Sequence, residues 1–305
     1  MVKKVEDVYL IDASIYIFKY YFSLPDNWWS REDFPTAAVY GYAHWLFRFL
    51  KNTKAKKVAA CFDESLQSCF RNKLYADYKS SRALPDDALA FQLAACKQIT
   101  GLLGIPCYAS KEYEADDLLG TLAMRCRSQS LRINLLTRDK DLAQLLLNAK
   151  ECIWDYPDGP RRYPADVQDK FGVAPTMLAD LLAIVGDPGD DIPGVPGVGV
   201  KTAAKILQTL GPWQKIRKDV GKIAILPIRG AAGIAQKLLI YKQQIDLSLK
   251  LATIASSAPL GRRFSVNRLA MKKNELIDFG LSLGFGSRFA ASVNKLQNEL
   301  IEFKK

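Results

Sequence analysis

Three short apolar runs along the chain predict the strands of a parallel sheet. The runs are Val8–Ile11, Lys57–Phe62 and Arg132–Leu136, and long segments with helical spacing separate them. Continuous apolar runs are typical of strands buried on both faces, and an intervening helix makes successive strands parallel. The pattern therefore predicts an α/β fold with a parallel sheet flanked by helices.

The segments between and after these runs carry helix signals. The helix expected at 36–52 is apolar on all sides, and the one expected at 87–103 ends before Gly104 and Pro106. Further helices are expected at 114–128, 141–147 and 175–185. After residue 185 the sequence becomes rich in Gly and Pro and then in Lys. We therefore expect an α/β domain at 1–185 and a smaller helical region at 186–305.

Acidic residues gather where the predicted strands end. Asp12 and Asp63 directly follow the first two runs, and Asp139 follows the third. Because the carboxyl ends of parallel strands meet at one edge of a sheet, we expect these side chains to lie close together. The other acidic clusters contain Glu114, Asp116, Asp117, Asp141, Asp187, Asp190 and Asp191. Such a gathering needs cations, and hard oxygen ligands favour Mg²⁺ or Mn²⁺.

Ordinary helix signals explain part of this pattern as well. Acidic residues are favoured in the first turn of any helix, which would account for Glu114, Asp116 and Asp117 without a metal. Asp139 has the position of a helix cap, whereas Asp141 needs another explanation. The combination with the strand-end carboxylates favours the metal-binding interpretation.

The charge balance indicates a polyanionic partner. The chain of 305 residues has 43 Lys and Arg against 32 Asp and Glu, a net charge of +11. A basic surface around an acidic site suits nucleic acid. No apolar run approaches the roughly 20 residues that span a bilayer, so no membrane partner is expected. The amino-terminal segment lacks a signal-peptide core, so we expect a cytoplasmic protein. The six scattered cysteines and the single histidine, His44, are expected to be packing residues.

A glycine-rich segment precedes a basic helix and is typical of a helix-hairpin-helix motif. Glycines allow the backbone to approach a phosphate, and the amides at a helix start point towards it. An ordinary Gly/Pro turn is the simpler alternative, but it does not explain the basic helix that follows. The expected DNA contacts are Gly194, Val195, Gly197, Val198, Gly199, Lys201, Thr202 and Lys205.

Aromatic and basic residues alternate just after the second predicted strand. Phe70, Arg71, Tyr78, Lys79 and Arg82 lie within this segment. The pattern favours base stacking and phosphate pairing with single-stranded nucleic acid. A solvated basic surface would produce the same pattern without a ligand.

Together these motifs resemble the 5′ nuclease superfamily, which includes the amino-terminal exonuclease domain of bacterial DNA polymerase I, its stand-alone relatives and flap endonucleases. The resemblance runs nearly end to end and in the family's order. It rests on the segments Leu10–Ser14, Pro35–Gly41, Cys61–Asp63, Phe70–Arg82, Tyr113–Asp117, Asp139–Asp141, Gly186–Asp190, Gly194–Ala203, Leu249–Ile254 and Leu283–Ser287.

The resemblance implies a PIN-like sheet, a helical arch at about 70–105 and a helix-hairpin-helix DNA-binding region at 186–305. It implies one metal site at Asp12, Asp63, Glu114 and Asp116, with Asp117 in support, and a second at Asp139, Asp141 and Asp187, with Asp190 nearby. Arg71, Lys79 and Arg82 would reach the scissile phosphate, Tyr78 would contact DNA, and K⁺ would bind at the hairpin.

The function implied is a structure-specific 5′ nuclease that uses two Mg²⁺ or Mn²⁺ ions. It would act as a 5′-3′ exonuclease and flap endonuclease on DNA ends, nicks, flaps and RNA primers in replication and repair. We expect a monomer that works beside a DNA polymerase and a ligase. The alternative is a DNA-junction-binding protein with weak or vestigial catalysis. A phosphatase would need Asp-x-Asp after the first strand, and an RNA-cleaving PIN-like domain would lack the hairpin.

Overall fold

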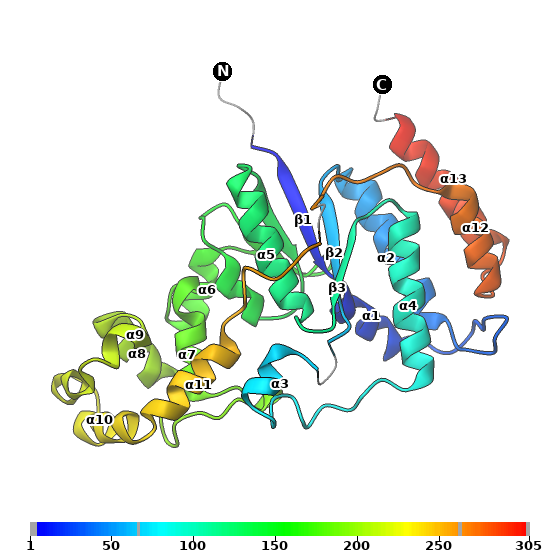
Figure 1. The fold of residues 1–305 in the computed structure, drawn as a ribbon. Helices are drawn as coiled ribbons and strands as arrows, with labels where there is room; N and C mark the ends of the chain where they lie inside the picture. Colours follow the sequence, from blue (N-terminus) through cyan, green and yellow to red (C-terminus); the bar gives the residue numbers. More distant parts are fainter. Residues whose placement is uncertain (1–4, 66–67, 262–263, 303–305) are drawn as a thin grey trace.

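A six-stranded sheet forms the centre of the protein (Figure 1). The computed structural model describes residues 5–65, 68–261 and 264–302. The strand order is β3-β2-β1-β4-β5-β6, and all neighbouring pairs are parallel except β5 with β6. The three predicted strands are confirmed as β1 (Asp7–Asp12), β2 (Val58–Asp63) and β4 (Arg132–Leu136). Three shorter strands were not predicted: β3 (Cys107–Ser110), β5 (Cys152–Trp154) and β6 (Arg161–Arg162).

Alternate residues of the central strands enter two separate cores. In β1, Val8 and Leu10 face one core, whereas Tyr9 and Ile11 face the other. The same alternation in β2 and β4 gives the sheet two apolar faces. Each face must therefore be covered by helices.

Helices cover both faces of the sheet, as expected (Figure 1). One face carries α1 (Ala13–Tyr21), α2 (Ala37–Thr53) and α4 (Asp87–Leu102), and the other carries α5 (Ala115–Ser128), α6 (Pro164–Phe171) and α7 (Leu178–Val185). The helix predicted at 141–147 is instead the short 3₁₀ helix η1 (Asp141–Leu145), and the one predicted at 175–185 starts as the 3₁₀ turn η2 (Pro175–Met177). Short segments often adopt this tighter hydrogen-bond pattern.

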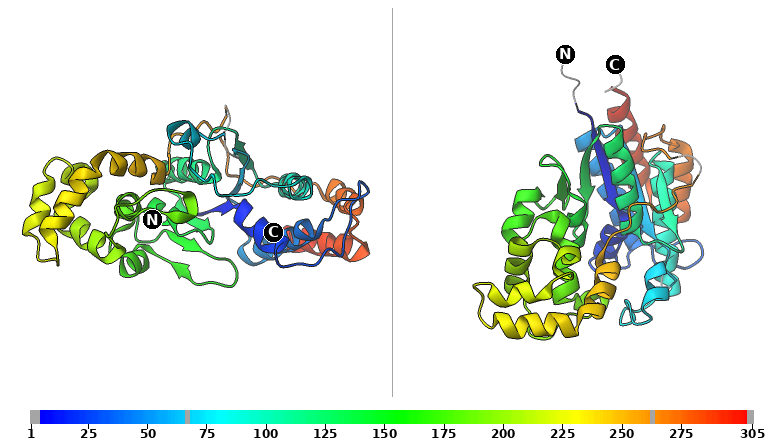
Figure 2. Two further views of the ribbon diagram at one scale, coloured as in Figure 1. Left: turned by 90° about the horizontal axis from the view of Figure 1, so that it is seen from below. Right: turned by 60° about the vertical axis from the view of Figure 1, so that its left-hand side comes forward.

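Beyond α7 the described part of the chain is mainly helical, and its helices divide between two places (Figure 2). One group lies beyond α7: α8 (Val200–Leu210), α9 (Trp213–Ile216), η4 (Val220–Ile225), α10 (Ala231–Ile240) and α11 (Lys242–Ala252). The last helices, α12 (Lys273–Ser282) and α13 (Ser287–Glu302), return to the face of α2 and α4. Phe289 of α13 is fully buried in the same core as Phe49 of α2. The division of the chain near residue 186 stays a prediction.

Two simpler expectations can also be compared with the structure. All six cysteines are free, and five of them are buried. The ring of His44 packs against those of Tyr40 and Phe289, as expected of a packing residue. Within the part of the chain that the structure describes, no helix is long and apolar enough to span a bilayer.

The packing of α13 predicts the effect of Phe289→Ala. Removing this buried ring should lower the free energy of unfolding by about 3–5 kcal/mol. Ile301→Ala, on an exposed position of the same helix, should change it by no more than about 0.5 kcal/mol. Urea unfolding of both variants measures the difference. Equal effects of the two substitutions would contradict the assignment of α13 to this core.

Candidate metal and nucleic-acid site

The strand-end carboxylates lie at one edge of the sheet. Asp12 ends β1 and Asp63 ends β2, while Asp139 follows β4, the strand on the other side of β1. Strands β2 and β3 lie on one side of β1, whereas β4 and β5 lie on the other, so the strand order changes direction at β1. The α/β proteins commonly bind ligands at such a point. The Thr137 hydroxyl donates to Oδ2 of Asp12 at 2.8 Å and accepts the amide of Asp139 at 2.9 Å. Thr137 therefore joins two predicted metal ligands, a role that its position at a strand end did not reveal.

The first turn of α5 brings further carboxylates to this edge. Glu114 is the N-cap of the helix, and its own amide is accepted by Asp117 in a capping box. The amide of Ala115 donates to Oδ1 of Asp63 at 2.9 Å, which fixes the helix start against β2. Asp116 and Asp117 are consecutive, so their side chains leave the helix in different directions. As a result, Asp116 belongs to the acidic edge and Asp117 does not.

Burial and mutual repulsion make these carboxylates hard to ionise. Burial, reinforced by Asp63 and Asp139, raises the pKa of Asp12 to about 7 although Thr137 opposes the shift. Burial and then the charges of Asp139 and Asp12 hold the pKa of Asp116 well above its usual value. Burial and the charge of Glu114 raise the pKa of Asp63. These side chains thus interact across the edge, and a cation there would relieve their repulsion.

Asp141 extends the cluster towards the second half of the chain. Burial, followed by the charge of Asp139, raises its pKa to about 7, and Asp187 and Asp190 add smaller effects. Its Oδ1 atom is buried and has no hydrogen-bond partner. Asp187 accepts the Gly189 amide at 3.0 Å and pairs with Lys140 at 3.1 Å. Asp141 therefore offers an unsatisfied oxygen where the second metal ion is predicted.

The donor set fits Mg²⁺ or Mn²⁺ in its chemistry. The residues at the edge supply only carboxylate and hydroxyl oxygens, which hard divalent cations prefer. Within the described residues, no three or more His, Cys, Asp or Glu side chains are already arranged as the ligands of one ion. Basic side chains pair with some of the predicted ligands: Lys79 and Arg71 with Glu114, Arg82 with Asp190, and Lys140 with Asp187. Side-chain cations thus hold Glu114, Asp187 and Asp190.

Arg71 does not have the position predicted for it. It lies on α3 (Phe70–Leu74), is 2% exposed, and uses all of its N–H donors inside the protein. Nε donates to the Leu251 carbonyl, Nη1 to Glu114 and Asp117, and Nη2 to Asp117 and the Thr253 carbonyl, at 2.7–2.9 Å. The prediction that Arg71 reaches a substrate phosphate is therefore wrong in this conformation. Both oxygens of Asp117 are likewise occupied, so this residue orients Arg71 instead of facing the acidic edge.

Tyr78 is also buried, at 3% exposure, and its ring is not available to stack on a base. Its hydroxyl donates to Glu114 at 2.9 Å and lies 3.4 Å from Asp190. The expected DNA contact is therefore not supported, and Tyr78 supports the carboxylates instead. Two residues of the aromatic and basic segment at 70–82, Arg71 and Tyr78, are thus buried and contact other parts of the protein.

Lys79 and Arg82 do lie at the acidic edge, in the loop after α3. Lys79 donates to Glu114 at 2.5 Å and lies 3.5 Å from Asp190. Arg82 is exposed, and its guanidinium pairs with Asp190 at 2.5 Å. Asp190 belongs to the turn η3 (Pro188–Asp190), so these contacts tie the loop to the second half of the chain. Both cations contact predicted metal ligands, and their catalytic role stays a prediction.

The predicted arch is only partly helical. Its second helix, α4, packs against α2 and contributes Cys96 and Ile99 to the core. Between α3 and α4, residues 76–82 form turns and a bend and residues 83–86 are irregular. Residues 76, 77, 80–84 and 86 of this segment are exposed.

The hairpin of the predicted DNA-binding motif precedes α8. Gly197 has a φ of +77°, and Gly199 is the N-cap of the helix. A Cβ on Gly194 would lie 2.1 Å from the Val185 carbonyl, so only glycine fits this close approach. Val195 and Val198 are buried and anchor the hairpin, while Lys201 and Lys205 are exposed and Thr202 is partly exposed. Lys237, which was not predicted, donates to the Pro196 carbonyl at 2.9 Å.

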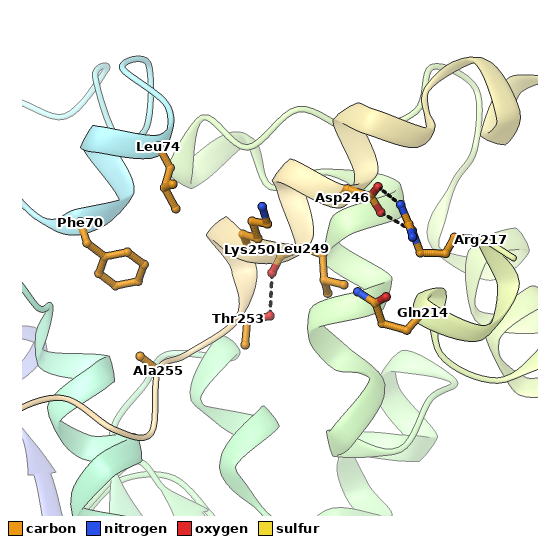
Figure 3. Close-up of a pocket in the computed structure, with 9 residues that line it drawn as sticks. All are labelled: Phe70, Leu74, Gln214, Arg217, Asp246, Leu249, Lys250, Thr253 and Ala255. Carbon is orange, nitrogen blue, oxygen red and sulfur yellow. Dashed lines mark hydrogen bonds and ion pairs between the residues drawn. The ribbon is translucent and has the colours of Figure 1, made fainter.

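A cavity of about 640 Å³ lies apart from the acidic edge, between α3, α9 and α11 (Figure 3). Its lining is mainly apolar and includes Phe70, Leu74 and Leu249. The charged pair of Arg217 and Asp246 closes one side with a contact of 2.6 Å. The cavity contains none of the predicted metal ligands.

A parallel sheet with carboxylates along one edge, followed by a hairpin and a basic helix, defines the class of 5′ nucleases. Family models support this class over most of the chain. Residues 7–172 match "5'-3' exonuclease, N-terminal resolvase-like domain", and residues 173–275 match "5'-3' exonuclease, C-terminal SAM fold". The chain belongs to the 5′-3′ exonuclease family.

Individual relatives agree with this assignment. The 5′-3′ exonuclease of Buchnera aphidicola subsp. Schizaphis graminum is 33% identical over 84% of this chain and 89% of its own length. DNA polymerase I of Pseudomonas aeruginosa is 36% identical over 82% of this chain, which spans only 27% of that protein. The solved structure of the bacteriophage T5 flap endonuclease with DNA and metal ions has a TM-score of 0.63 at 18% identity and covers 97% of this chain and 98% of its own. That structural likeness shows the shared fold.

The buried contacts of Arg71 predict a large loss of stability in Arg71→Ala. The substitution leaves Asp117 charged and unpaired, which should lower the free energy of unfolding by about 3–5 kcal/mol. Lys73→Ala on the exposed side of the same helix should cost less than about 1 kcal/mol. Chemical denaturation compares the two variants. Unchanged stability of Arg71→Ala would contradict the structural role.

The raised pKa of Asp141 predicts how the metal-free protein responds to pH. A carboxyl whose folded pKa exceeds its unfolded value stabilises the protein below the unfolded pKa near 4, and that stability is lost as pH rises through about 7. In EDTA, Asp141→Asn should therefore raise the free energy of unfolding at pH 8 by roughly 1–3 kcal/mol. Denaturation at pH 5 and pH 8 tests this, with exposed Asp169→Asn as the control. The same pH slope in both variants would refute it.

Proposed function

We propose that the protein is a structure-specific 5′ nuclease that hydrolyses phosphodiesters at 5′ ends, nicks and 5′ flaps of DNA, including RNA primers. The observation that carries the proposal is the buried group of repelling carboxylates at the sheet edge, beside two basic side chains. Family membership supports the reaction, and relatives named DNA polymerase I support work beside a DNA polymerase. Cooperation with a ligase is part of the same proposal.

We propose that two Mg²⁺ or Mn²⁺ ions bind at this edge. Asp12, Asp63, Glu114 and Asp116 would hold one ion, and Asp139, Asp141, Asp187 and Asp190 would surround the other. When bound, such ions activate a water molecule and stabilise the leaving oxygen of a phosphodiester. The unsatisfied Oδ1 of Asp141 and the raised pKa of Asp12 support a cation here.

The chain's own residues would orient the substrate and neutralise its charge. If Glu114 and Asp190 held metal ions, Lys79 and Arg82 would be free to pair with the scissile phosphate. Comparable groups stabilise a transition state by roughly 3–4 kcal/mol each. The amides of the hairpin at residues 194–199, with Lys201 and Lys205, would hold a phosphate of the duplex, where K⁺ would add to the binding. Phosphate contacts of this kind make binding weaken steeply with salt.

The first test is cleavage of end-labelled 5′-flapped and nicked DNA with Mg²⁺. We expect the wild type to release 5′ fragments and Asp139→Ala to lose at least roughly 10²-fold in rate, since it removes a central carboxylate. Both proteins should bind the same DNA in Ca²⁺, and exposed Asp169→Ala should cleave like the wild type. Junction binding without cleavage by the wild type would favour a DNA-junction-binding protein with vestigial catalysis. If the wild type neither binds nor cleaves, both functions are excluded.

A further inference from the structure

The loop that carries Lys79 and Arg82 donates to two backbone carbonyls of the acidic turn, from the Lys79 amide to Asp190 at 3.1 Å and from Arg82 Nε to Gly189 at 3.3 Å. It is also held by two kinds of contact with acidic side chains. The first kind uses Asp190, whose carboxylate pairs with Arg82 at 2.5 Å and lies 3.5 Å from Lys79. The second kind uses Asp191, whose Oδ2 accepts the Ser81 hydroxyl at 2.7 Å and the Ser81 amide at 3.0 Å. Ser81 lies between the two cations in the sequence.

We infer that Asp191 positions Lys79 and Arg82 for the reaction by holding Ser81. The inference rests on the proposed function, because it concerns the same site. Asp190 and Glu114 are predicted metal ligands, so their ion pairs with the loop must be exchanged when metal ions bind. The contact between Asp191 and Ser81 involves no predicted ligand, so it survives this exchange. It therefore keeps the freed cations within reach of the phosphate.

The turn that carries Asp191 is suited to this role because its backbone is fixed. Asp187 and Ile192 exchange two backbone hydrogen bonds of 2.9 Å, which close the turn. Asp191 has a φ of +55°, in the left-handed region, which directs its side chain away from the regular path of the chain. Gly186 and Gly194 pack too closely for any side chain, so the turn is seated firmly on α7. The turn that carries Asp191 is thus held by its own backbone hydrogen bonds and by its close contact with the end of α7.

The Ser81 contact holds both the backbone and the side chain of the loop, because the Ser81 amide and the Ser81 hydroxyl both donate to the Asp191 carboxylate. The Ser81 contact fixes the loop beside Lys79. Lys79 itself has a φ of +53°, and its amide donates a hydrogen bond to the Asp190 carbonyl at 3.1 Å. Small displacements of groups that contact a reacting phosphate have large effects on rate.

The test compares Asp191→Ala, Asp191→Asn and Ser81→Ala by single-turnover cleavage of flapped DNA and by DNA binding in Ca²⁺. Asp191→Ala should lower the cleavage rate by about tenfold or more while the dissociation constant for DNA changes less than about twofold. Asp191→Asn retains an oxygen acceptor and should restore most of the rate. The double variant Ser81→Ala/Asp191→Ala should cleave DNA no more slowly than Asp191→Ala alone, since both substitutions weaken the same contact.

A second readout does not depend on cleavage of DNA. Trypsin should cut after Lys79 and Arg82 faster in Asp191→Ala than in the wild type, with and without Ca²⁺, while the melting temperature stays unchanged. Asp219→Ala, an exposed aspartate in the helical region, is the control for both assays. An inactive wild type would count against the proposed function, whereas trypsin would still report on the contact. If Asp191→Ala cleaves DNA at the wild-type rate and trypsin cuts it no faster than the wild type, the inference is overturned.

Discussion

Repulsion among buried carboxylates at one edge of the sheet is the constraint on which the site depends. The parallel strands bring Asp12, Asp63 and the residues after β4 to the same place, and α5 adds Asp116. Such a group is stable only when cations compensate it or when some members keep their protons. In this structure both occur: several of the pKa values are raised, and Lys79 pairs with Glu114.

Four basic side chains compensate this charge, and Lys140 does so by pairing with Asp187. The other three have different roles. Arg71 is buried and holds Glu114 and Asp117 in place, so it belongs to the framework of the site. Lys79 and Arg82 lie at the border of the site and pair with side chains that metal ions would claim. Lys79 and Arg82 therefore neutralise carboxylates in this structure. In the proposed reaction they would pair with a phosphate of the substrate instead. The contact of Asp191 with Ser81 limits how far those charges move.

The sequence predicted the parts that depend on local pattern. Apolar runs revealed β1, β2 and β4. The acidic residues at their ends were correctly expected at one edge of the sheet, since strand direction alone brings them together. β3 was missed because its four residues are all half-buried and of mixed polarity. Arg71 and Tyr78 were misassigned, because an aromatic and basic pattern does not show whether a side chain meets a phosphate or a distant residue such as Glu114. The return of α13 to α2 depends on Phe289, whose partner is far away in sequence.

The most direct test of a cation site at the acidic edge is titration of the protein with Mn²⁺, followed by electron paramagnetic resonance of the free ion. The wild type should bind about two ions at neutral pH. Combined replacement of Asp12, Asp116 and Asp139 by Asn should remove this binding, while the exposed substitution Asp169→Asn should leave it unchanged. Absence of saturable binding by the wild type, or the same binding by the triple variant, would contradict the account.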